Sequence, residues 1–137
     1  MAATRPLARR IAALAAAGAA ALYLLIGLGV VRIGESAAGG TPDLLGFGAT
    51  LGALYLATAI LLMRSSSPVV WAAIALFQVV VIVGYFAFSS LREPPIEMWG
   101  LLIKACQAGV LAVAGYVVLG QLGSRAGHAR RRTGGVA

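Results

Sequence analysis

The strongest candidates for chemistry in this chain are polar side chains inside its long apolar runs. Lys104 is the only charged residue within these runs, and Gln107 follows it by about one helical turn. Counted at about 1.5 Å per residue, Lys104 lies roughly 10 Å inward of Glu97, and Gln107 roughly 15 Å. In the preceding run, Gln78 lies about 16 Å inward of Ser89. These similar depths in adjacent helices predict a hydrogen bond between Gln78 and Gln107.

Lys104 has two possible roles at this depth. A charge there costs roughly 3 kcal/mol on insertion scales, so such lysines usually line a cavity or have a partner. Glu97 is the nearest acid on roughly the same helix face, and Tyr85 or a water molecule is a candidate bridge to it. Lys104 either belongs to an anion or proton site or extends to the outer headgroups. The candidate intramembrane polar site comprises Lys104, Gln107, Gln78, Glu97 and Tyr85.

Other polar residues extend this pattern inward and outward. Thr50 and Tyr23 lie about 10 Å and 13 Å inward of the outer ends of their runs, so both are expected at the same layer. Nearer the surface, Arg92, Glu93 and Trp99 crowd around a Pro-Pro turn. This outer rim is either a binding rim or, more simply, a set of helix-end charges with an interfacial Trp anchor.

The elements that must position these residues are four apolar runs at 11–31, 44–63, 69–88 and 98–120. Each has about 20 residues, enough to cross a hydrocarbon core roughly 30 Å thick. The chain of 137 residues is 61% hydrophobic, with a mean hydropathy of +0.94. These features predict an all-α fold, an integral membrane four-helix bundle forming a single membrane domain over 1–137. The basic segment 121–137 is expected to be a disordered tail.

Arginine placement predicts the orientation in the membrane. Basic residues near span ends are retained on the cytoplasmic side. Eight arginines precede the first run, separate the second from the third or follow the fourth, whereas Arg32 and Arg92 lie in the other loops. Both termini are therefore expected to be cytoplasmic. The first run exceeds the roughly 7–15 residues of a signal-peptide h-region, which favours its retention as a span.

Small residues indicate where the helices pack. Gly48 and Gly52 form a GxxxG pattern, and Ala12, Ala16 and Ala20 line one face of the first run. Helix association in lipid depends on such close backbone packing. We expect these faces to pack within the chain, with a homodimer as the alternative.

Several chemistries are excluded by composition. Cys106 is the only cysteine, so there is no disulfide and no CxxC redox pair; His128 is the only histidine and lies in the tail. We therefore expect no cofactor, no metal site and no catalytic residues. The runs also lack the carboxylate on which small four-span multidrug exporters depend. The arginine-rich tail follows from topology and anionic headgroups, so nucleic acid is not expected as a partner.

The leading functional hypothesis is a non-enzymatic accessory or scaffold subunit that acts through helix contacts in the bilayer. Its expected partners are the lipid bilayer and a membrane protein or a second copy. The alternative is a small transporter or channel for an anion or small solute around Lys104. A membrane enzyme ranks third. Arginine outnumbers lysine ten to one among the 11 basic residues, and Ala and Gly are abundant. This composition suggests a multi-pass protein of a bacterial cytoplasmic membrane.

Overall fold

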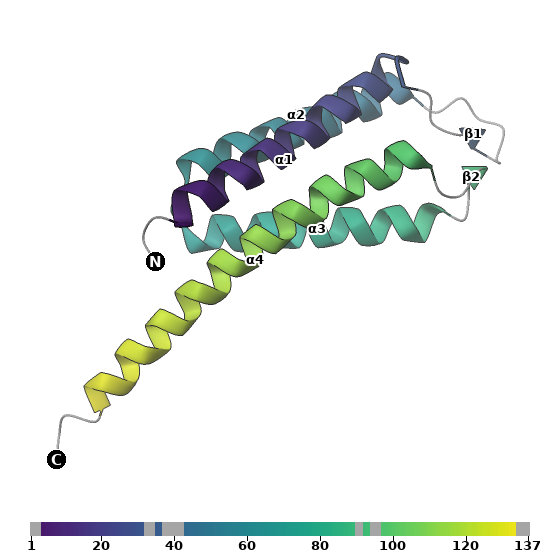
Figure 1. Ribbon diagram of the computed structural model, residues 1–137. Helices are drawn as coiled ribbons and strands as arrows, with labels where there is room; N and C mark the ends of the chain where they lie inside the picture. The colour runs from purple at the N-terminus through teal and green to yellow at the C-terminus, as the bar shows by residue number, and fades with distance from the viewer. Residues whose placement is uncertain (1–3, 32–34, 37–42, 90–91, 94–96, 134–137) are drawn as a thin grey trace.

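The computed structural model describes residues 4–31, 35–36, 43–89, 92–93 and 97–133. These ranges form four helices, α1 (Thr4–Gly27), α2 (Leu44–Arg64), α3 (Pro68–Ser89) and α4 (Met98–Thr133). They also contain a two-residue antiparallel pair between β1 (Glu35–Ser36) and β2 (Arg92–Glu93). In Figure 1 the beginning of α1 and the far end of α4 lie at one end of the molecule, and the β pair lies at the other.

The predicted all-α class is confirmed, and all four helices of the described ranges are long and apolar enough to cross a membrane. Their apolar segments are Pro6–Gly27, Leu44–Arg64, Pro68–Ala87 and Met98–Gly120. The first segment begins and ends earlier than the predicted run 11–31. A helix-ending turn stops α1: Gly29 has φ +71°, its N–H bonds to the Ile26 carbonyl, and the Val30 N–H bonds to the Leu25 carbonyl. Glycine adopts this left-handed conformation without a Cβ penalty.

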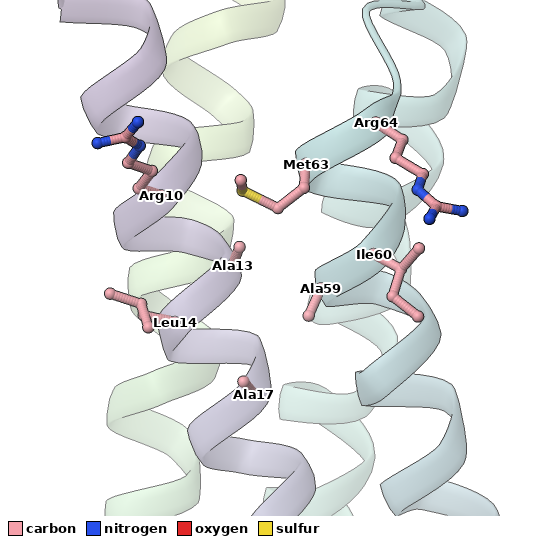
Figure 2. Close-up of a pocket in the computed structure, with 8 residues that line it drawn as sticks. All are labelled: Arg10, Ala13, Leu14, Ala17, Ala59, Ile60, Met63 and Arg64. Atoms are coloured by element: carbon pink, nitrogen blue, oxygen red, sulfur yellow. The ribbon is translucent and has the colours of Figure 1, made fainter.

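Glycines bring α1 and α2 into close contact near the β end. A Cβ on Gly48 would lie 2.5 Å from the Gly27 Cα and 2.5 Å from the Tyr23 carbonyl oxygen. A Cβ on Gly52 would lie 2.8 Å from the Leu24 side chain. The GxxxG pattern therefore serves packing within the chain, as predicted. At the opposite end of this pair, a groove of about 570 Å³ opens between the helices (Figure 2).

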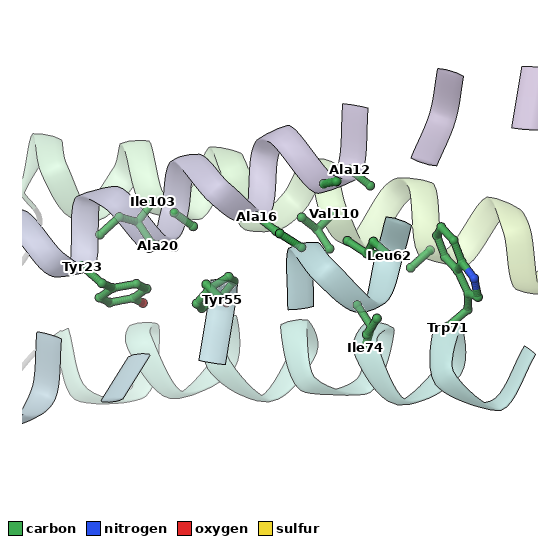
Figure 3. Close-up of a cluster of buried hydrophobic side chains, with 14 of the residues drawn as sticks. Ala12, Ala16, Ala20, Tyr23, Tyr55, Leu62, Trp71, Ile74, Ile103 and Val110 are labelled. Atoms are coloured by element: carbon green, nitrogen blue, oxygen red, sulfur yellow. The ribbon is translucent and has the colours of Figure 1, made fainter. Parts of the chain in front are cut away.

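Helix α1 is central to the packing, because it contacts both α2 and α4, while α3 packs mainly on α4 and scarcely on α2. The alanine face of α1 is buried as expected, with Ala12 and Ala16 fully covered. Figure 3 shows this face beside Val110 of α4 and Leu62 of α2. Small side chains on α1 thus allow two neighbouring helices to approach it closely.

An arginine joins the start of α1 to the turn between α2 and α3. The Arg9 guanidinium donates to the Ser65 carbonyl oxygen at 2.7 Å and to Ser66 Oγ at 3.0 Å. It also lies 5.8 Å from the ring centroid of Trp71, whose Nε1 donates to the same Ser65 carbonyl at 3.2 Å. Trp71 is fully buried, so it is not the simple interfacial residue that its position near a helix end suggests. These contacts fix the turn against α1.

The other end is organised by one helix cap and the β pair. Asp43 caps α2 by accepting a 2.8 Å hydrogen bond from the Gly46 N–H, which satisfies a free donor of the first turn. Glu35 pairs with Glu93, and Ser36 with Arg92, so the loop after α1 meets the loop after α3. Sequence periodicity gives no signal for a pair this short. The predicted Pro-Pro turn, Pro94–Pro95, lies outside the described residues.

The predicted disordered tail is replaced by helix over most of its length. Helix α4 has 36 residues and continues from the apolar segment through Thr133, projecting well beyond the other helices in Figure 1. The alanine and arginine residues of this extension favour helix, and no proline interrupts it. The last part of the predicted tail, 134–137, lies outside the described residues.

Candidate functional site

Each of the four helices contributes a polar side chain to one buried cluster. We call it the buried polar network and define it as Tyr23 of α1, Tyr55 of α2, Gln78 of α3, and Lys104 and Gln107 of α4. All five side chains are buried, and Lys104, the most accessible of them, is 8% exposed. Buried polar groups in a membrane domain require partners within the protein, because lipid supplies none.

The network begins on α4 with Lys104. Its ammonium donates a hydrogen bond to the side-chain oxygen of Gln107 and lies 4.7 Å from the ring centroid of Tyr85. A cation over an aromatic face is attracted by the ring quadrupole. The lysine thus hydrogen-bonds inward along its own helix, which is not the placement of a side chain that extends to the headgroups. Its ring partner is held close to α4, because Gly100 lacks a Cβ that would meet the Tyr85 hydroxyl.

Two tyrosines carry the network from α4 to α3. The Gln107 amide nitrogen donates to the Tyr23 hydroxyl at 3.1 Å. The Tyr23 ring stacks on the Tyr55 ring with centroids 5.5 Å apart and planes 25° apart. The Tyr55 hydroxyl donates to the Gln78 side-chain oxygen at 2.9 Å. Each glutamine amide therefore bonds to a tyrosine hydroxyl, in place of the predicted bond between the two amides.

Both glutamines lie at a common depth, as predicted, but the side chains of Tyr23 and Tyr55 lie between them. Tyrosine hydroxyls extend much farther from the backbone than amides do, so they reach the glutamines first. Phe47 and Phe77 pack against the stacked pair, with centroid distances of 5.8 Å to Tyr23 and 5.5 Å to Tyr55 respectively. This aromatic shell keeps the surroundings of the hydrogen bonds apolar.

One polar atom in the network has no partner. The Gln78 Nε2 is buried and makes no hydrogen bond within the described part of the chain, although the same amide accepts from Tyr55 through its oxygen. An unsatisfied buried donor costs about 1–3 kcal/mol. It is therefore the one position in the network where a further acceptor would be stabilising.

The remaining predicted site residues are more dispersed. Glu97 lies half-buried at the start of α4, outward of the network, and Trp99 is 40% exposed. Arg92 and Glu93 join the β pair through their backbones, and their side chains lie outside the described part of the structure. Thr50 is exposed on α2 and does not join the layer predicted for it, whereas Tyr23 does.

Sequence reasoning missed Tyr55, which links α2 to α3. A signal for it existed: counted from Asp43, Tyr55 lies about 18 Å deep, near the depth estimated for Gln78 and Gln107. A hydroxyl that deep in lipid requires an acceptor inside the protein. The clamp made by Arg9 and Trp71 had no comparable signal, because it depends on how the turn after α2 folds.

The network is suited to holding helices together and to binding one polar group at Gln78. No group of three or more His, Cys, Asp or Glu side chains able to hold a metal ion occurs among the described residues. Comparison with protein-family models, curated proteins and solved structures finds no match for this chain. The functional argument therefore rests on the geometry of these side chains and on the surface around them.

Proposed function

We propose that this chain is a non-enzymatic, multi-pass protein of the cytoplasmic membrane that acts as an accessory or scaffold subunit through helix contacts in the bilayer. The observation that carries the proposal is the buried polar network. It contains one polar side chain or more from every helix, and these side chains are joined by three hydrogen bonds and by the stacking of Tyr23 on Tyr55. These hydrogen bonds and the ring stack hold the four helices in one arrangement, a four-helix bundle with an apolar exterior.

The exterior supports the same proposal. Helix α3 is the least covered of the four, because only 17% of its most apolar stretch is buried within the protein. Its outward face carries exposed branched and aromatic side chains, among them Val79, Val80, Val83 and Phe86. Branched side chains lose little rotamer entropy on packing, because their χ1 is already restricted. This face suits contact with a transmembrane helix of another membrane protein.

The proposed orientation places both termini and the Ser65–Ser66 turn in the cytoplasm. The arginines of this end support it through the positive-inside rule. Cysteine labelling tests it in a Cys106→Ser background: Ala38→Cys should react with a membrane-impermeant maleimide in intact cells, and Ser66→Cys only in opened cells. The reverse pattern would overturn the orientation.

A transporter or channel for an anion or small solute is the second candidate, and one observation favours it. A buried ammonium and an unpartnered amide nitrogen belong to the same network, so both donors could serve a polar solute. Lys104→Met distinguishes the two functions, because Met keeps the aliphatic stem and removes the charge. Chloride flux into vesicles should be absent for the wild type under the scaffold proposal. Flux that Lys104→Met abolishes would support transport.

Photo-crosslinking tests the scaffold proposal on the surface that carries it. A photo-reactive residue in place of Val80 on α3 should give a discrete heteromeric product in the native membrane. The matched control replaces Leu56 on α2, which is 52% exposed against 61% for Val80. We expect no discrete protein product from the control. Equal products from both positions, or none from Val80, would contradict a specific contact through α3.

A further inference from the structure

The groove between α1 and α2 lies apart from the buried polar network, at the end of the molecule that holds the start of α1. Its volume of about 570 Å³ falls in the roughly 300–1,000 Å³ range of small-molecule sites. Alanines make it hollow, and larger apolar side chains border them. The lining residues are Arg10, Ala13, Leu14, Ala17, Ala59, Ile60, Met63 and Arg64. Figure 2 shows Met63 directed between the helices.

Two exposed arginines border this groove at one end. Arg10 is on α1 and Arg64 is the last residue of α2, and Figure 2 shows their guanidinium groups on opposite sides of the groove, both directed away from it. Neither makes a hydrogen bond or ion pair within the part of the chain that the structure describes. The neighbouring Arg9 differs, since it is engaged by Ser65 and Ser66. Arg10 and Arg64 therefore remain available to an external anion.

Among the described residues, no acidic side chain lies at this end of the helices. The four acidic residues of the chain are Glu35, Asp43, Glu93 and Glu97. They belong to β1, β2 and the first residues before α2 and α4, which is the opposite end of the helices. An anion bound by these two arginines would therefore come from outside the described residues, and the membrane surface carries anionic phosphates.

The length and the rim of the groove indicate which of two occupants fits it, a lipid or a partner helix. From Arg10 to Ala17 the groove follows α1 for about 10 Å, and from Arg64 to Ala59 it follows α2 for about 7 Å. It therefore occupies only the part of one leaflet that lies nearest the headgroups. A phospholipid needs a cationic rim at headgroup depth and an apolar trough directly below it, and this groove has both, whereas a partner transmembrane helix would have no use for two arginines at its rim.

We propose that this groove is a binding site for one anionic phospholipid. The headgroup phosphate lies at the rim of the groove, where the exposed side chains of Arg10 and Arg64 turn inward to bind it, and the upper part of one acyl chain lies over Ala13, Ala17 and Ala59. Arginine suits this role because its planar guanidinium binds phosphate oxygens through paired hydrogen bonds. The site is independent of the proposed scaffold function, since it uses neither the α3 face nor the buried polar network.

Native mass spectrometry of the full chain tests the proposal. The protein is reconstituted into bilayers of equal amounts of phosphatidylglycerol and phosphatidylcholine and then released from them. We expect a population that retains one phosphatidylglycerol. In Arg10→Gln/Arg64→Gln its apparent affinity should fall about 30-fold, which corresponds to ~1 kcal/mol for each arginine at 1.4 kcal/mol per tenfold change.

Two control variants separate this site from general charge attraction. Arg125→Gln/Arg130→Gln removes the same charge from the α4 extension and should leave retention unchanged. Ala17→Phe fills the trough, keeps both arginines, and should reduce retention of phosphatidylglycerol, whereas binding of inorganic phosphate alone would survive it. Equal retention of phosphatidylcholine, equal loss in both double variants, or retention unaffected by Ala17→Phe would overturn the proposal. A second protein chain bound in place of the lipid would overturn it as well.

Discussion

The Tyr55 hydroxyl on α2 donates a 2.9 Å hydrogen bond to the Gln78 side-chain oxygen on α3. These two helices scarcely touch elsewhere, because α2 packs on α1 and α3 packs on α4. The long tyrosine side chain therefore crosses a space that the backbones leave open. Together with the packing of α1 on α4, this contact at the middle of α3 and the Arg9 clamp at its start connect the α1–α2 pair to the α3–α4 pair.

Loss of the Tyr55 hydroxyl should destabilise the protein. In Tyr55→Phe both the oxygen and the nitrogen of the buried Gln78 amide lack a partner, and we expect unfolding to become easier by about 1–2 kcal/mol. Unfolding in mixed micelles titrated with a denaturing detergent measures this change. Tyr116→Phe is the control, since that side chain is 64% exposed and should tolerate the change. Equal effects of the two variants would contradict a structural role for Tyr55.

Removal of both partners should cost less than removal of one. The double variant Tyr55→Phe/Gln78→Met leaves no orphaned amide, so we expect it to regain most of the stability lost in Tyr55→Phe and to lie within about 0.5 kcal/mol of the wild type. The four proteins of this double-mutant cycle, measured in the same micelles, give the coupling energy. Additive losses would indicate that the hydrogen bond contributes nothing specific.

The close approach at Gly48 should tolerate no side chain. In Gly48→Ala the new Cβ meets backbone atoms of α1 at 2.5 Å, so the helices must separate, and we expect a loss of about 2 kcal/mol. Gly84→Ala is the matched control, because nothing lies within 4 Å of its Cβ position. That control should be neutral or slightly stabilised, since Ala favours helix over Gly. A Gly48→Ala protein as stable as the wild type would contradict a close α1–α2 contact at this position.

The Arg9 clamp should depend on guanidinium geometry as well as on charge. Arg9→Lys keeps the charge but loses the planar guanidinium, which donates from Nη2 to the Ser65 carbonyl and Ser66 Oγ while lying 5.8 Å from the Trp71 ring centroid. We expect a loss of about 1 kcal/mol, with faster proteolysis at the turn between α2 and α3. Arg10→Lys serves as the control in lipid-free micelles. Equal rates of proteolysis at this turn in Arg9→Lys and Arg10→Lys would contradict the role of the Arg9 clamp.

Much of the architecture could be predicted from the sequence, because hydrophobic length and helix-ending residues act locally. The apolar runs, the alanine face of α1 and the GxxxG contact follow from spacing alone. The end of α1 was predicted too late, since a long apolar run outweighed the glycines at 27 and 29. Hydropathy does not register the positive φ that Gly29 allows.

The site was less predictable, because side-chain reach and helix rotation decide it. Depth counting brought Gln78, Lys104 and Gln107 to one layer, and the structure buries all three. It could not determine which residue each amide meets, and so Tyr55 went unnoticed. The α1–α2 groove was also beyond sequence reasoning, because it depends on where two helices diverge.

The most direct test of the scaffold function is native mass spectrometry of the wild-type protein and of Lys104→Met, each extracted with its surrounding lipid. The account predicts a second membrane protein in fixed stoichiometry with the wild type and an equal amount with Lys104→Met. The substitution should not affect the partner, because Lys104 is buried and the proposed contact face lies on α3. A lone monomer or homodimer, together with chloride flux that Lys104→Met abolishes in reconstituted vesicles, would contradict the account and assign the network to transport.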